Sequence, residues 1–319
     1  MWSNSPMLSS QVDAGGTPRV SVVIPVYESQ ATLERCLDGL ARQTFTGFEV
    51  VAVDSSPGEA SHEVLRRHPE VRAIRSRLRM LPQEARRRAI EAARGELLVS
   101  IDPDVYPHRE WLERLVAAHD EGGRPAVVGA LACHGRRWLD TGIHLCKFSK
   151  WLPGRSVTGV DVGPSANLLV DRDAFEDAGG FSGDAFFGDA TLSWTLTGDR
   201  RGLPFAADAV VDHHHLSTFG EFVSERYRRG VEFGRLRLSW RGAGRARALG
   251  LLVVTALPLR LASNLLHVAR HAADAGQLGS LAATSPVVFA GVAASLAGEA
   301  VGYARALVTP PAPAWAATR

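Results

Sequence analysis

Apolar strands that alternate with helices constrain the fold of this chain more than any other feature. Residues 20–27 form a continuous, largely β-branched apolar run, and similar runs return at residues 48–53 and 97–101. Strands that are apolar on both faces are typical of parallel sheets, because the crossover connections place helices on both sides. The sequence therefore predicts an α/β fold with a mostly parallel sheet.

Weaker signals complete the predicted elements. Further strands are expected at residues 71–74, 126–132, 166–170 and 205–211. Helices are expected up to about residue 67, at residues 83–94, 109–119 and 190–196, and from Arg172 onward. An earlier helix, with Cys36 on its apolar face, is predicted to be capped by Ser29, and Gly95 is predicted to close the helix at 83–94. Residues 134–162, which contain Pro153 and several glycines, are predicted to form an irregular, variable loop.

Several classes of protein are excluded by the residues after the first strand and by composition. Residues 25–29 contain no glycine, so neither a dinucleotide fingerprint nor a phosphate-binding loop is present there. The balance of 36 Lys+Arg against 34 Asp+Glu gives a net charge of only +2, which argues against a dedicated nucleic-acid binder. The three cysteines show no C-x-x-C spacing and predict neither a disulfide framework nor a zinc site. The polar first 17 residues do not resemble a signal peptide, so a cytoplasmic protein is expected.

Acidic residues stand at the carboxyl ends of two predicted strands. Asp54 ends the second strand, and Asp102-Pro103-Asp104 follows the strand at 97–101. In open α/β sheets, ligands bind at this edge. In extended chain, Asp102 and Asp104 would point the same way, and two carboxylates on one side can hold a divalent cation that also binds diphosphate oxygens. The alternative is a loop-start pair that caps the helix near Arg109.

Six segments in chain order resemble the motifs of family 2 glycosyltransferases. They are residues 22–27, 49–55, 85–96, 102–104, 167–181 and 188–194, within a similar region of about residues 18–233. The resemblance implies a GT-A fold, a Rossmann-like sheet with helices on both faces, here followed by an α-helical C-terminal region. It also implies an inverting transfer from a nucleotide-diphosphate sugar to a hydroxyl acceptor, with Mg²⁺ or Mn²⁺ as cofactor.

The resemblance also assigns roles to individual residues. Asp189 would be the general base, and Asp104 would ligate the metal, with His213 as a second candidate ligand. The donor side would comprise Pro25, Tyr27, Glu28, Asp54, Arg86 and Asp102. The acceptor side would comprise Asn167, Gly188 and Trp194.

Two departures from the family pattern bear on function. Gly188 stands where the family has an acid before the base, which leaves open a nucleotide-sugar-binding protein with a degraded acceptor site. The Q-x-x-R-W motif of processive synthases is missing, and residues 224–230 stand near its place, so single-sugar addition is expected. A nucleotidyltransferase is the rival enzyme class, although residues 26–30 lack its glycine-rich, basic loop.

Clusters of one residue type have two interpretations each. His213 and His215 share a face in extended chain, and the resemblance makes one of them a metal ligand or a diphosphate contact; a polar strand end is the alternative. The arginines between residues 72 and 88 predict a solvated surface, or a diphosphate contact through Arg86 and Arg79. Those between residues 226 and 237 predict a surface helix, or contact with anionic lipid or a lipid diphosphate. Trp138 and Trp151 predict packing, or stacking on a sugar.

The C-terminal third changes in composition. Residues 248–259 are apolar but short, and residues 275–298 lack charge but are only mildly hydrophobic. A hairpin in the inner leaflet, amphipathic helices on the membrane surface and a soluble helical cap all fit this pattern. We expect association with the cytoplasmic face of the cell membrane, and a lipid-linked acceptor. The predicted domains are a disordered tail at 1–17, the α/β domain at 18–240, the apolar helical region at 241–309 and a disordered tail at 310–319.

Overall fold

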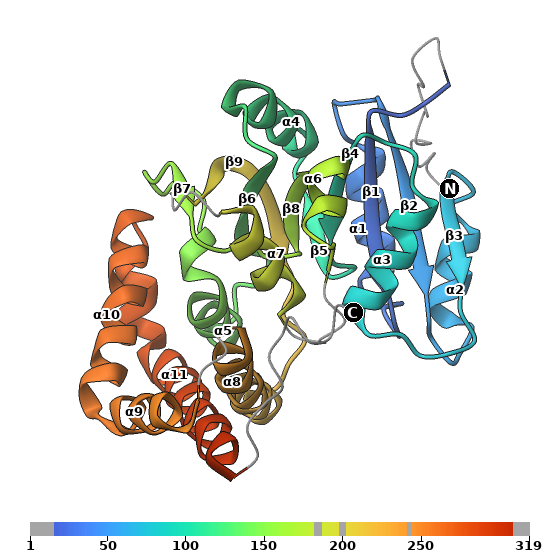
Figure 1. The fold of residues 1–319 in the computed structure, drawn as a ribbon. Coiled ribbons are helices and arrows are strands. Elements are labelled where there is room, and N and C mark those ends of the chain that lie inside the picture. Colours follow the sequence, from blue (N-terminus) through green and yellow to red (C-terminus); the bar gives the residue numbers. More distant parts are fainter. Residues whose placement is uncertain (1–15, 182–186, 198–201, 241–243, 309–319) are drawn as a thin grey trace. The chain divides into compact units, whose positions relative to one another are not determined.

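The computed structural model describes residues 16–181, 187–197, 202–240 and 244–308. Nearly all of the predicted N-terminal tail and all of the predicted C-terminal tail lie outside these residues. The chain forms two compact units (Figure 1). The first runs to His134 and resumes from Trp151 to His214, and the second comprises Gly135–Lys150 and the chain from His215 onward.

A mixed sheet forms the first unit, in the order β3-β2-β1-β4-β8-β6-β9-β5, with β7 paired to β9. The parallel half comprises β1 (Val20–Val26), β2 (Phe48–Asp54), β3 (Val71–Arg75) and β4 (Leu97–Ile101). The other half comprises β5 (Val105–Pro107), β6 (Ala126–Cys133), β7 (Gly159–Val160), β8 (Asn167–Asp171) and β9 (Leu203–His213). Because β1 lies between β2 and β4, the strand order reverses beside β1, where α/β sheets bind ligands.

Helices bury the sheet of the first unit. They are α1 (Leu33–Ala41), α2 (Ala60–Arg66), α3 (Pro82–Ala92), α4 (Trp111–Gly122), α6 (Arg172–Asp177) and α7 (Gly188–Leu196). Val23 and Val51 pack in one cluster with Ala85 and Ala89 of α3. Their neighbour Val22, which alternation directs to the opposite face, is equally buried. The continuous apolar runs are therefore explained by a sheet that is covered on both faces.

Two local predictions were wrong. The Ser29 side chain does not cap α1; its hydroxyl donates to the Tyr27 carbonyl instead, and only its backbone carbonyl accepts the Leu33 N–H, at 2.9 Å. Gly95 does not close α3, which ends at Ala92. A Cβ at Gly95 would lie 2.7 Å from the Ser21 nitrogen, so glycine is required there by close packing.

About half of the predicted loop at residues 134–162 is instead helical. The segment contains α5 (Trp138–Phe148), the short 3₁₀ helix η1 (Ser149–Trp151) and β7. The glycine in α5, Gly142, is a packing position: a Cβ there would lie 2.6 Å from the Val287 Cβ. The glycines that indicated a loop thus include one that admits a neighbouring helix.

The second unit is a helical bundle around one long helix. It contains α5, α8 (Phe219–Trp240), α9 (Arg245–Ala256), α10 (Pro258–Asp274) and the central α11 (Leu278–Val308). α8 and α11 interlock through small residues, since a Cβ at Gly230 would lie 2.1 Å from the Ser295 oxygen and one at Gly298 would lie 2.0 Å from the Tyr227 oxygen. The predicted boundary at residue 240 was therefore wrong, because α8 packs with the C-terminal helices.

A buried acid ties three helices of the bundle together. Glu299 of α11 is 4% exposed and accepts hydrogen bonds from Arg260 of α10 (2.7 Å) and Arg237 of α8 (3.3 Å). It also accepts one from the Tyr303 hydroxyl, whose pKa is raised to about 12 by burial and by Glu299 itself. Breaking one partner of such a buried network leaves an uncompensated charge.

Length and composition leave few membrane-crossing candidates among the described residues. α11 has a mean hydropathy of 1.6 over its most apolar window, of which 39% is buried. α9 and α10 together pass the same test but are bent by 70°.

Candidate active site

The candidate site lies at the carboxyl ends of β1, β2 and β4 in the first unit. Tyr27 and Glu28 follow β1, Asp54 ends β2 and Asp102 follows β4. Because parallel neighbours end at the same edge, the strand register alone brings these polar groups together.

The Asp102-Pro103-Asp104 segment is a turn rather than extended chain. The Val105 N–H donates to the Asp102 carbonyl at 3.2 Å, which leaves Pro103 at the second position of a β-turn, where proline is favoured. The predicted extended geometry was therefore wrong. The turn still brings the two carboxylates together, because atoms of Asp102, Asp104 and His213 all lie within 4.8 Å of one another.

These three side chains fit a divalent cation. Two carboxylates and one imidazole form a donor set that suits Mn²⁺ and also Mg²⁺, which prefers oxygen. His213 ends β9 and pairs with Val105 of β5. This pairing places the Nε2 atom of His213 3.8 Å from Asp104 Oδ2. The His214 N–H also donates to the Asp104 carbonyl at 2.8 Å.

The three histidines that follow Asp212 have different partners. His214 Nδ1 lies 2.9 Å from the Tyr106 hydroxyl in the first unit. His215 belongs to the second unit, where its Nε2 atom lies 3.1 Å from His144 Nδ1. Of the pair predicted to share a face, His213 alone is grouped with Asp102 and Asp104.

Arg86 is the buried cation of the site. It projects from α3 with 2% exposure, donates to Ser100 Oγ at 2.8 Å and is paired with Asp102. A guanidinium in this position fixes the Asp102 carboxylate and places positive charge beside the turn. The nearby Arg87 and Arg88 are exposed, as a solvated helix face predicts.

Asp189 occupies the first turn of α7. Its Oδ2 atom accepts the Ser165 N–H at 3.2 Å, and its Oδ1 atom accepts the Ala190 N–H at 2.9 Å. The side chain is half-buried, so its carboxylate is oriented but not sealed from solvent.

A chain of hydrogen bonds connects Asp189 to Asp102. Ser165 donates its N–H to Asp189, and its carbonyl accepts from Ser100 Oγ at 2.7 Å. Ser100 in turn accepts from Arg86, which holds Asp102. Ser100 and Ser165 were not among the predicted site residues, although a serine inside the apolar strand β4 was a signal for the former.

We expect Ser100→Ala to lower turnover about tenfold or more, since a hydrogen bond to a charged group contributes about 1.5–3 kcal/mol. The Michaelis constant for donor should rise as well, because Arg86 loses its Nε partner. Steady-state kinetics test this against Ser21→Ala, which removes a buried serine from β1 that bonds Glu49 instead. Equal kinetics for the two variants would contradict the positioning role, and Ser100→Thr should restore activity.

Asp54 is fully buried. Its Oδ1 atom accepts the Ser56 N–H at 2.9 Å, whereas Oδ2 has no hydrogen-bond partner among the described residues and lies 3.8 Å from His62 Nδ1. A buried carboxylate oxygen left unsatisfied costs free energy. Because Asp54 is 0% exposed, any ligand that pairs with Oδ2 requires its surroundings to rearrange.

The chain just after β1 has an unusual backbone conformation at Glu28. Glu28 has φ of 48°, the only positive value at a non-glycine among the described residues, and its N–H donates to Ser56 Oγ at 2.8 Å. Such outliers cluster at functional sites. The Arg79 guanidinium lies 4.6 Å from the centre of the Tyr27 ring, while Pro25 is buried within β1.

The three residues predicted on the acceptor side differ in exposure. Asn167 is 0% exposed, and its amide donates to the carbonyls of Ala130 and Ala209 and accepts from Trp111 Nε1. It therefore holds strands together, and the prediction of an acceptor contact is not supported by its position. Gly188 is buried at the start of α7, and Trp194 is half-buried on the same helix.

The indoles of Trp138 and Trp151 form hydrogen bonds within their own units. Trp138 Nε1 donates to the Ala283 carbonyl in the second unit, and Trp151 Nε1 donates to the Val162 carbonyl in the first. Trp151 also packs against the core of the first unit, which supports the packing interpretation for it, whereas Trp138 is 52% exposed.

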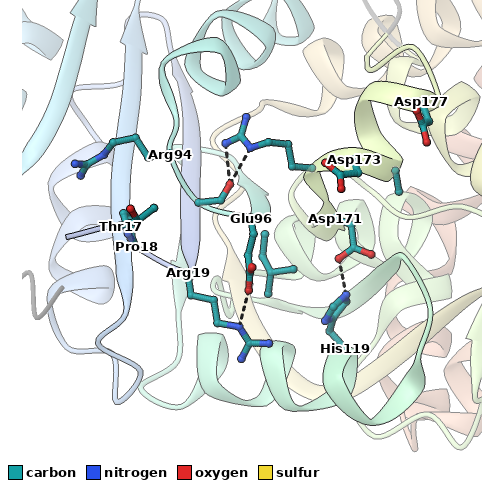
Figure 2. A pocket seen from close by; sticks show the side chains of 13 residues that line it. Thr17, Pro18, Arg19, Arg94, Glu96, His119, Asp171, Asp173 and Asp177 are labelled. Atoms are coloured by element: carbon teal, nitrogen blue, oxygen red, sulfur yellow. Dashed lines mark hydrogen bonds and ion pairs between the residues drawn. The ribbon is translucent and has the colours of Figure 1, made fainter. Parts of the chain in front are cut away.

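A separate cavity of about 930 Å³ lies at the opposite edge of the sheet (Figure 2). Two ion pairs form among its charged groups: Arg19 with Glu96, and His119 with Asp171 at 2.8 Å. Arg172 donates to the Gly95 carbonyl. The ion pairs stabilise the amino ends of β1 and β4, and the predicted site residues lie elsewhere.

The chain is similar in sequence to known proteins. Residues 21–170 match the model of the family described as Glycosyl transferase family 2. The chain is similar to Glycosyltransferase AglE of Haloferax volcanii, with 29% identity over 67% of this chain and 72% of that one. It is also similar to the pre-mycofactocin glycosyltransferase of Mycobacterium tuberculosis, with 27% identity over 65% of this chain but 45% of that one.

Among solved structures, the mannosyltransferase PcManGT of Pyrobaculum calidifontis, in complex with GDP-Man and Mn²⁺, resembles the chain. The likeness covers 97% of this chain and 90% of that one, at 20% identity and a TM-score of 0.59. The fold is thus that of the GT-A glycosyltransferases, and the relatives identify a transferase enzyme. Residues 21–170 form a domain of glycosyltransferase family 2.

Proposed function

We propose that this enzyme transfers a single sugar from a nucleotide-diphosphate donor to a hydroxyl acceptor with inversion, and that it depends on a divalent cation. The observation that carries the proposal is the cluster of Asp102, Asp104 and His213 beside the buried Arg86. That PcManGT was solved with GDP-Man and Mn²⁺ supports the same class of donor here.

Two groups of residues would bind the donor and the metal. Arg86 and Asp102 orient the diphosphate end of the donor, and Tyr27 and Asp54 lie at the strand ends where the nucleoside would bind. Asp104, Asp102 and His213 would hold Mg²⁺ or Mn²⁺, which would neutralise charge on the departing diphosphate.

Asp189 would take the proton from the acceptor hydroxyl. Its two backbone N–H contacts fix the carboxylate, and the start of a helix favours its ionised form. The acceptor oxygen then forms a bond to the anomeric carbon from the face opposite the diphosphate. The bond between the anomeric carbon and the diphosphate oxygen breaks, and the nucleoside diphosphate leaves. A single displacement of this kind inverts the configuration.

Thermal unfolding with UDP, GDP, dTDP and CDP, each with and without Mn²⁺, tests donor binding. A ligand at about one hundred times its dissociation constant stabilises a fold by about 2.7 kcal/mol. We expect one diphosphate to raise the melting temperature only with Mn²⁺ present. A shift that is independent of metal would contradict the metal role.

Turnover separates the enzyme from the binding-protein alternative that Gly188 raises. We expect the matching nucleotide sugar to be converted to its nucleoside diphosphate when a hydroxyl acceptor is present. Metal-dependent binding without any release of diphosphate would favour the binding protein instead.

We also propose that the enzyme works at the cytoplasmic face of a membrane on a lipid-linked acceptor. The supporting observation is the exposed apolar surface of α9 and α10. It includes Val253 and Val254 of α9 and the largely exposed Leu259 of α10.

A further inference from the structure

The exposed side of α9 and α10, here called the elbow face, is largely apolar, although Ser263 and His267 of α10 are also exposed on it. Its large apolar side chains are Leu249, Val253, Val254, Leu257, Leu259 and Leu266. Leu259, at the 70° bend between the two helices, is 75% exposed. Leu249 and Val253 lie four apart on α9, so they share one side of that helix, and Leu257 follows at the bend.

Positive charge stands at both outer ends of the elbow face. Arg245 lies at the start of α9, with Arg247 nearby, and Arg270 lies four residues beyond Leu266 on α10. All three arginines are exposed, and none has an acidic partner within the described part of the chain. No Asp or Glu occurs between residues 245 and 273.

α11 is long enough to span a membrane, but it packs against α5, α8, α9 and α10 within the second unit. Its Glu299 pairs with Arg260 and Arg237, and its glycines interlock with α8. α8 carries eight charged side chains: Glu221, Glu225, Arg226, Arg228, Arg229, Glu232, Arg235 and Arg237. If hydrocarbon surrounded α11, it would also surround much of α8. Placing the charged side chains of α8 in hydrocarbon would cost too much free energy.

We infer that the second unit binds in the plane of a membrane surface that carries anionic lipid headgroups. The elbow face enters the boundary between headgroups and acyl chains, the arginines contact the headgroups, and α11 stays within the protein. This inference rests on the membrane association proposed above. A lipid partner is favoured over a protein because the face combines exposed aliphatic side chains with arginines at both ends and contains no acidic residue between residues 245 and 273, as expected for helices that lie on an anionic membrane surface.

Co-sedimentation of the full chain with phosphatidylcholine vesicles, with and without phosphatidylglycerol, tests the inference. We expect strong binding only when the anionic lipid is present. Arg245→Glu/Arg270→Glu should weaken it at least about 30-fold, since each basic residue near an anionic surface contributes about 1 kcal/mol. Leu259→Glu should weaken it about tenfold or more, because a buried leucine contributes at least about 1.5 kcal/mol.

Matched controls come from the first unit. Arg87→Glu/Arg88→Glu makes the same change in net charge, and Leu78→Glu alters a leucine that is 77% exposed; both should bind vesicles within about twofold of the unmodified protein. Equal losses in test and control variants would overturn the inference, as would equal binding to both kinds of vesicle. A dimer that Leu259→Glu dissociates would also overturn it, since a second copy would then cover the face.

The same variants separate this inference from the proposed function. Their Mn²⁺-dependent stabilisation by a nucleoside diphosphate should persist, because the elbow face holds none of the site residues. Vesicle binding without any nucleotide effect would leave the docking surface in place and contradict donor binding. The reverse result would contradict the docking surface alone.

Discussion

Asp189→Asn should reduce turnover by about 10²–10⁴-fold, the usual contribution of a general base, while donor affinity changes less than about twofold. The carboxamide has nearly the same shape but cannot take a proton from the acceptor hydroxyl. It can still accept one of the two backbone N–H bonds, from Ser165 or from Ala190. The loss should therefore appear in kcat rather than in folding.

Single-turnover rates with saturating donor, together with a donor-binding curve for the same preparation, measure this effect. Asp173→Asn is the matched control, because Asp173 also lies in the first turn of a helix but is exposed on α6. Turnover of Asp189→Asn within about threefold of the unmodified enzyme would remove Asp189 as the base. A parallel loss of donor affinity would indicate a damaged site instead.

The half of the site that rests on strand register could be predicted from the sequence. Asp54 and Asp102 each follow a buried parallel strand, so position in the chain alone places them at one edge. Arg86 was predicted from the family resemblance, and in the structure it is buried on α3, which packs on β1 and β2. Contacts of this kind can be predicted from the sequence, because buried positions recur at regular spacing along one helix or strand.

The features that the sequence did not predict depend on contacts between distant segments. Ser100 and Ser165 became part of the site only because β4 and the segment before β8 lie side by side. Asn167 matched a family motif, yet its amide bridges β6 and β9 at a position where Gly129 leaves room for it. A local motif does not record which side of a strand meets another strand.

The domain boundary was wrong for a similar reason. Composition changes near residue 241, but packing changes earlier, because Gly230 and Gly234 of α8 fit against α11. The inserted α5 joins the same bundle from a segment whose glycines indicated a loop. Glycines that admit a neighbouring helix and glycines that permit turns look alike in one sequence.

Asp104→Ala should abolish metal-dependent donor binding, with a loss of at least about 100-fold in affinity, or about 2.7 kcal/mol. The substitution removes one carboxylate from a cluster of three ligands. Asp102 is a poorer test of the metal, because its removal also leaves the buried Arg86 without its carboxylate partner. His213→Ala should weaken binding in the same direction.

Calorimetric titration of the nucleoside diphosphate, with and without Mn²⁺, separates the two contributions. Asp212→Ala is the matched control, since Asp212 is the acid next to His213 in β9 but contacts His108 at 3.1 Å. If both aspartate variants lose affinity equally, the effect is one of general negative charge rather than of ligation. If Asp104→Ala binds donor as tightly as the unmodified enzyme with Mn²⁺ present, the cation is held elsewhere and the turn after β4 serves only to place Asp102.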